Sequence, residues 1–123
     1  MLRNTTAAIL TLVAGSLVAT AALAHPKLVK SDPAADAVVS TSPKELRLSF
    51  NEELVPKFSG AEVKDQKGQK VEIGTTAADP TDKKQLVIPL SKPLAKGIYK
   101  VNWHAVAADT HRVQGDYSFT VKQ

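Results

Sequence analysis

The fold of this chain is decided by the stretch Tyr99–Ala105, which reads YKVNWHA. Apolar and polar residues alternate along it, and successive side chains of a β-strand point to opposite faces of a sheet. Such a strand buries one face and exposes the other, as in an antiparallel sheet that covers a core on one side. We therefore predict a half-buried strand here, with His104 on its outward face.

The same alternation recurs along the chain, in residues 46–50, 86–90 and 117–121. Two shorter apolar runs flank Lys67-Gly68 and predict a hairpin. Turn-forming pairs separate these segments, and helical periodicity is absent after residue 25. The pattern predicts an all-β antiparallel sandwich or Greek-key barrel. We expect its aromatic core to come from Phe50, Tyr99, Trp103 and Phe119, with Phe58 plugging one end.

The first 24 residues do not follow this strand pattern. They resemble a secretory signal peptide. Arg3 gives a positive start, Ala7–Ala22 is an apolar run, and Ala22-Leu23-Ala24 is the small-x-small pattern of a cleavage site. A membrane anchor is the alternative, but the apolar run is short and rich in alanine. We expect cleavage after Ala24, and an exported domain, residues 25–123, that does not stay inserted in the membrane.

Composition narrows the chemistry of this domain. The chain has no cysteine, and its one methionine is Met1, so the processed protein would contain no sulfur. Disulfides and thiolate ligands are therefore excluded. The formal net charge of +4 is weak and evenly spread, which does not favour nucleic-acid binding.

The processed chain would begin with His25-Pro26. An N-terminal histidine offers its α-amine and its imidazole Nδ1, which together close a chelate ring on one metal ion. Both groups lose their protons to a strong Lewis acid near neutral pH. Pro26 has no amide proton, so copper cannot bind a deprotonated amide there. The alternative is that cleavage exposes a histidine by chance.

A second candidate element is Asp109-Thr110-His111. A carboxylate and an imidazole two residues apart project to the same side of an extended chain. The alternative is a simple turn, in which Asp109 caps backbone amides and His111 is solvated. Together with His25, the segment gives two imidazoles, an amine and a carboxylate, a nitrogen-rich set that suits Cu(II).

Several motifs in order make the chain resemble one family. They span nearly all of residues 25–123: His25-Pro26-Lys27-Leu28-Val29, Ser31-x-Pro33-Ala34, Leu48-x-Phe50-Asn51-Glu52, Phe58-Ser59-Gly60-Ala61, Gly97-x-Tyr99-x-Val101-x-Trp103 and Asp109-x-His111. The chain is similar to the CopC family of periplasmic copper-resistance proteins. That resemblance implies a seven-stranded, Ig-like Greek-key β-barrel or sandwich with a cupredoxin-like appearance.

The resemblance also implies a site and partners. By position, the ligands of one Cu(II) ion are His25, Asp109 and His111, and Glu52 is a weaker, outer contact. Glu53, next to it, is expected to point the other way. The implied protein is a monomer that binds copper ions and passes them to an inner-membrane copper transporter of the CopD type.

One departure from the family narrows this expectation. Some CopC proteins carry a second, Cu(I) site in a methionine-rich loop, but residues 64–84 here contain neither Met nor His. Soft Cu(I) prefers sulfur ligands. We therefore predict one Cu(II) site and no dedicated Cu(I) site.

Three function classes remain open from the sequence. The first is a non-catalytic periplasmic Cu(II) binder for copper sequestration, trafficking or resistance, with His104 as a surface residue outside the site. The second is a histidine-brace copper enzyme of the lytic polysaccharide monooxygenase type. Asp109 would fill a position that such an enzyme keeps open. The third, an Ig-like adhesion or chaperone module without metal, leaves the His25, Asp109 and His111 combination unexplained.

Overall fold

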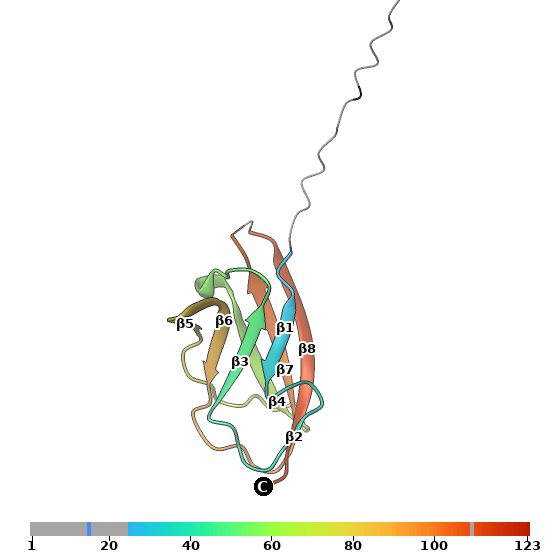
Figure 1. Ribbon diagram of the computed structural model, residues 1–123. Coiled ribbons are helices and arrows are strands. Elements are labelled where there is room, and N and C mark those ends of the chain that lie inside the picture. The colour runs from blue at the N-terminus through green and yellow to red at the C-terminus, as the bar shows by residue number, and fades with distance from the viewer. Residues whose placement is uncertain (1–14, 16–24, 109) are drawn as a thin grey trace, which may run out of the picture.

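The computed structural model describes residues 15, 25–108 and 110–123 and consists of two β-sheets packed face to face (Figure 1). The predicted signal peptide, apart from residue 15, and Asp109 lie outside the described residues. One sheet has the order β1-β3-β6-β5 and the other β2-β8-β7-β4. The strands are β1 (Leu28–Asp32), β2 (Val38–Val39), β3 (Glu45–Phe50), β4 (Gly60–Asp65), β5 (Ala77–Asp79), β6 (Asp82–Pro89), β7 (Gly97–Val106) and β8 (Arg112–Val121).

The all-β sandwich that the alternation predicted is confirmed, with a small difference in strand number. Eight strands lie in the described part of the chain where seven were expected, and two of them are very short: β2 has two residues and β5 has three. The one helical segment described is the 3₁₀ turn η1 (Pro56–Phe58). No helix among the described residues is long and apolar enough to cross a membrane.

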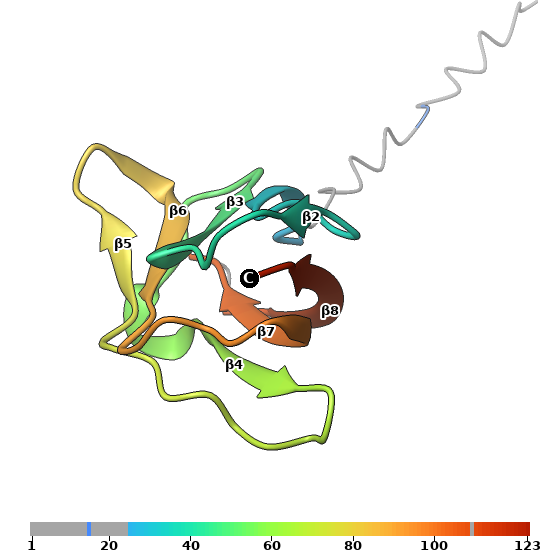
Figure 2. The same cartoon turned by 90° about the horizontal axis from the view of Figure 1, so that it is seen from below.

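The longest pairing in the molecule joins β7 and β8. Ten register pairs run without interruption from Gly97↔Val121 to Val106↔Arg112. Seen from below, this hairpin and β4 form one layer, while β3, β6 and β5 form the other (Figure 2). The hairpin therefore fixes which side chains of both strands face the core, because a slip of one residue would reverse them.

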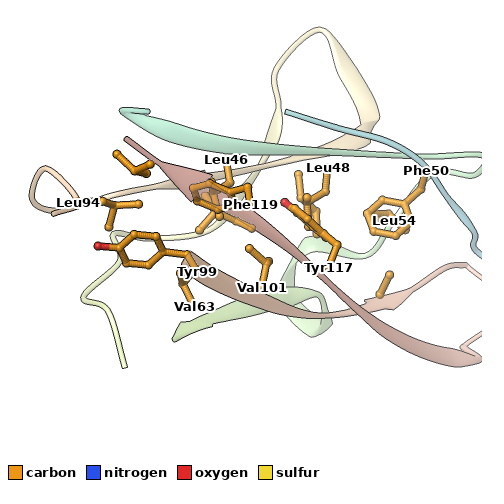
Figure 3. Packing of buried hydrophobic residues seen from close by; sticks show 14 residues of the cluster. Leu46, Leu48, Phe50, Leu54, Val63, Leu94, Tyr99, Val101, Tyr117 and Phe119 are labelled. Carbon is orange, nitrogen blue, oxygen red and sulfur yellow. The ribbon is translucent and has the colours of Figure 1, made fainter. Parts of the chain in front are cut away.

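The core lies between the layers and follows the predicted alternation. Leu46, Leu48 and Leu86 are fully buried, as are Val101 and Ala105 on the opposite sheet. Figure 3 shows Leu46, Leu48 and Val101 among the side chains that fill the space between the sheets. Burying each of the leucine and valine side chains contributes about 1.5–3 kcal/mol of transfer free energy. The hydrophobic effect over this interface is what holds the two sheets together.

Aromatic contacts extend the core toward both ends. The rings of Tyr99 and Phe119 stack with centroids 5.8 Å apart, and the Tyr99 hydroxyl donates a 2.6 Å hydrogen bond to the carbonyl of Ala95. At the other end, Phe50 and Trp103 meet edge to face at 5.2 Å. Trp103 lies over Gly115, its cross-strand partner.

Phe58 does not plug the core as predicted: it is 58 % exposed. Leu54, four residues earlier, is buried instead and forms an isolated β-bridge with Ala107. Phe58 ends the tight η1 turn, in which its amide donates to the carbonyl of Val55. This turn directs the ring outward and places the buried Ser59 at the base of the turn.

The predicted hairpin around Lys67-Gly68 is present. The amide of Val71 donates to the carbonyl of Val63 at 2.8 Å. Gly68 has a φ of 79°, a conformation that favours glycine. The carboxylate of Asp65 accepts the amides of Lys67 and Gln69, each at 2.9 Å, and so holds the turn closed.

A charged network ties the short strand β5 to its sheet. Arg47 on β3 donates to Asp79 on β5 and to Gln85 on β6, each at 2.7 Å. Hydrogen bonds from Thr81, followed by that from Arg47, lower the pKa of Asp79 to about 2. The carboxylate therefore stays charged in the folded protein well below the pH at which it would protonate in an unfolded chain.

We predict that Gly115→Ala destabilises the domain. A Cβ atom at this position would lie 2.5 Å from Cζ2 of Trp103, so the indole or the strand has to shift. Overpacking of this kind costs about 1–3 kcal/mol. Urea unfolding followed by the fluorescence of the single tryptophan measures the effect. Gln114→Ala, at the exposed neighbouring position, is the control and should change stability little. Equal midpoints for both variants would contradict the prediction.

We also predict that Asp79→Asn lowers the melting temperature at neutral pH and that the difference from wild type vanishes in acid. Because folding depresses this pKa, its stabilisation is complete above about pH 4 and is lost as the pH falls through about 2. Thermal melts between pH 2 and pH 7 test this. Asp116→Asn, which removes an exposed ion pair with Lys100, should have little effect throughout.

Candidate metal centre

Two segments from opposite ends of the domain meet at one end of the sandwich. β1 starts there, and so does the loop between β7 and β8, while the C-terminus lies at the other end (Figure 1). His25 is exposed and stands three residues before β1. His111 is exposed and immediately precedes β8. The fold therefore brings both predicted ligand segments to the same place.

The rings of His25 and His111 face each other with their centroids 5.0 Å apart and their planes at 47°. A first-row metal ion binds imidazole nitrogen at about 2 Å. Two imidazoles on adjacent coordination positions of one ion then have centroids roughly 4.5 Å apart. The observed spacing is close to this value, and both rings are accessible from solvent. The centroid spacing is therefore compatible with two imidazoles that share one ion.

The loop that carries His111 is held by the strands on either side of it. The amide of Thr110 donates to the carbonyl of Ala107 at 2.9 Å, which ties this residue to the end of β7. Thr110 has a φ of 66°, in the left-handed region. Asp109, the predicted carboxylate ligand, lies outside the described residues.

Glu52, the predicted outer contact, lies in the turn that follows β3 and is half-buried, whereas Glu53 is exposed. This turn is tied to the end of β7, because the amide of Val55 donates to the carbonyl of Val106 at 2.8 Å. Glu52 therefore belongs to the same end of the sandwich. Within residues 25–108 and 110–123, no three His, Cys, Asp or Glu side chains gather closely enough to hold a metal ion.

His104 lies apart from the two facing histidines, on the outer face of β7. It pairs with Gly60 on β4 and Gln114 on β8, and its ring packs over the bare backbone of Gly60. The outward placement predicted from alternation is confirmed, and the side chain is half-buried. Burial lowers its pKa, and the positive charge of Arg112 lowers it further. Both effects favour the neutral form of the imidazole.

Asn51 anchors the start of the domain, a role that was not predicted from the sequence. The amide of Lys27 donates to Oδ1 of Asn51 at 2.7 Å, and the amide of Asn51 donates to the carbonyl of Lys27 at 3.1 Å. Asparagine after a strand commonly hydrogen-bonds nearby backbone, so Asn51 carried a local signal. Nothing in the sequence indicated that its partner would be the residue two positions after His25.

Comparisons with known proteins cover most of the described chain. The CopC domain family matches residues 28–122. Copper resistance protein C of Xanthomonas campestris pv. juglandis is 43 % identical over 116 residues, which cover 90 % of this chain and 91 % of that protein.

Two solved structures share the fold. The crystal structure of PcoC, described as a methionine-rich copper resistance protein from Escherichia coli, has a TM-score of 0.72 and 41 % identity, covering 80 % of this chain and all of that one. CopC from Methylosinus trichosporium OB3b has a TM-score of 0.74 and 32 % identity, covering 80 % and 94 %.

Proposed function

The chain belongs to the CopC family, and from this premise we propose that it is a periplasmic protein that binds one Cu(II) ion through a mature amino terminus at His25. The observation that carries the proposal is the 5.0 Å contact between the rings of His25 and His111. Cleavage after Ala24 would free the α-amine beside the first of these rings. Asp109 would then add a carboxylate to an amine and two imidazoles.

The chemistry of this donor set supports copper as the cargo. Nitrogen donors with one carboxylate suit the tetragonal geometry of Cu(II), and affinity along the divalent series is highest for copper. The three residues contribute in different ways. His25 chelates through its α-amine and its imidazole, His111 supplies a second imidazole, and the carboxylate of Asp109 offsets positive charge on the ion. Glu52 is proposed as an outer contact that adds negative charge at the rim.

The amino-acid composition supports a single site. The relative PcoC is described as methionine-rich, whereas this chain has one methionine, at position 1, and no cysteine. Because Cu(I) is bound best by thioether and thiolate sulfur, we propose that copper is held as Cu(II). Transfer between two sites on the same molecule, with a change in oxidation state, is not part of this proposal.

We propose a non-catalytic role in copper sequestration, trafficking or resistance. The aspartate would occupy a position that an oxygen-activating copper keeps open. The expected partner is an inner-membrane copper transporter of the CopD type. Exposed Phe58 supports contact with a partner at this end of the sandwich, since η1 directly follows the segment bonded to Val106.

The proposal predicts that one extra residue before His25 sharply weakens copper binding. An added residue converts the α-amine into an amide and so removes the nitrogen that closes a chelate ring with the imidazole of His25. Cu(II) affinity is measured by competition titration, with an EPR spectrum of each form. We expect at least a 100-fold loss of affinity, about 2.7 kcal/mol, and a changed spectrum. Equal affinity and identical spectra would show that the terminus is incidental.

A second prediction separates the two remaining histidines. His111→Ala should weaken Cu(II) binding strongly, because it removes one of the two facing imidazoles. His104→Ala should leave affinity within about twofold, since its ring packs against Gly60 on another face. The same titration compares the two variants. Equal losses would mean that the ligands are assigned wrongly.

A further inference from the structure

We propose that Asn51 is the positioning residue for His25: its two hydrogen bonds to Lys27 aim the amino terminus at His111. The inference rests on the proposed function, and it concerns a residue that is not itself a copper ligand. It is drawn from three features of the described structure, namely the two hydrogen bonds, the burial of Pro26 and an irregularity in β1.

The first feature is a two-point clasp around a single residue. Lys27 donates its amide to Oδ1 of Asn51 at 2.7 Å and accepts the amide of Asn51 at 3.1 Å. One side chain and its own backbone therefore hold both hydrogen-bonding groups of Lys27. Neither bond belongs to the regular ladder of β1 and β3, whose first register pair is Leu28↔Phe50.

The second feature is the irregularity in β1 at Val29. Leu28 faces Phe50, but Lys30 faces Ser49, so the register shifts between them and Val29 bulges outward, 64 % exposed. Bulges of this kind change the direction in which neighbouring side chains point and are common beside functional sites. Without the shift, Leu28 would share its face with the outward Lys30.

The third feature, the burial of Pro26, follows from the register of β1. Pro26 lies two residues before Leu28, on the same face of the chain, and it is buried. His25 and Lys27 therefore take the opposite, exposed face. Side-chain burial at Pro26 and the clasp at Lys27 restrain consecutive residues, and the ring of Pro26 fixes one further torsion angle. Few rotations are left between the clasp and the α-amine.

These restraints matter because ordering a flexible terminus opposes metal binding. A free end would have to give up backbone freedom at several residues when it closes on the metal, whereas a clasped one has already done so. His111 needs no comparable restraint, because the hydrogen bond from Thr110 to Ala107 and the β7–β8 ladder hold the residues next to it. The terminal half depends on Asn51.

The test compares Asn51→Ala with Asn51→Asp, which keeps the Oδ1 acceptor. Asp65→Ala is the matched control. The carboxylate of Asp65 also accepts two backbone amides, but it lies at the end of β4 that pairs with Tyr99, away from the two histidines. All forms start at His25. Exchange of the Lys27 amide is measured without metal, unfolding is measured in urea, and Cu(II) affinity is measured by competition with EPR spectra.

We expect Asn51→Ala to lose protection of the Lys27 amide and to bind Cu(II) on the order of tenfold more weakly, as is typical when a group that orients a ligand is removed. Asn51→Asp should restore protection of that amide and most of the affinity. Asp65→Ala should lose stability and keep the wild-type affinity and spectrum.

Two outcomes would overturn the role. If Asn51→Ala frees the Lys27 amide and still binds Cu(II) like the wild type, the clasp does not position His25, although the proposed function stands. If Asp65→Ala weakens binding equally, the effect is one of general stability. Failure of the wild-type protein itself to bind Cu(II) would overturn the proposed function, and this is seen before any variant is compared.

Discussion

The uninterrupted register of β7 and β8 is the constraint on which the rest of the molecule depends. Ten consecutive pairs give both strands one buried face and one exposed face. The buried face supplies six of the fourteen buried residues of the core cluster, and the loop at the end of the ladder carries His111. Because the period of a strand is two residues, core packing and loop position are set by the same pairing. A shift in one would displace the other.

Much of the fold could be predicted from alternation alone. The strands that hold Leu46, Leu86, Val101 and Phe119 were indicated by period-two patterns, and these residues are buried as expected. The two short strands were not predicted, since two or three residues are too few to show a period. Phe58 was placed wrongly because hydrophobicity indicates burial in general. It does not reveal that Leu54 already occupies the end of the core.

The candidate site, too, could be predicted only in part. The chemistry of an N-terminal histidine and of a D-x-H segment pointed to His25 and His111 before any geometry was known, and the structure places their rings 5.0 Å apart. What holds His25 in place could not be predicted. The clasp of Asn51 on Lys27 joins residues distant in sequence, and such a contact depends on how β1 is paired and where it bulges.

The pair formed by His25 and His111 also depends on the folding of the whole domain. One ring precedes the first strand and the other precedes the last, so the pair cannot exist until β8 has closed on β7 and β1 has docked on β3. A chain without β8 would present His25 without its counterpart. An ion that bridges the two would bind only the finished domain, and by mass action it would stabilise the folded state against unfolding and proteolysis.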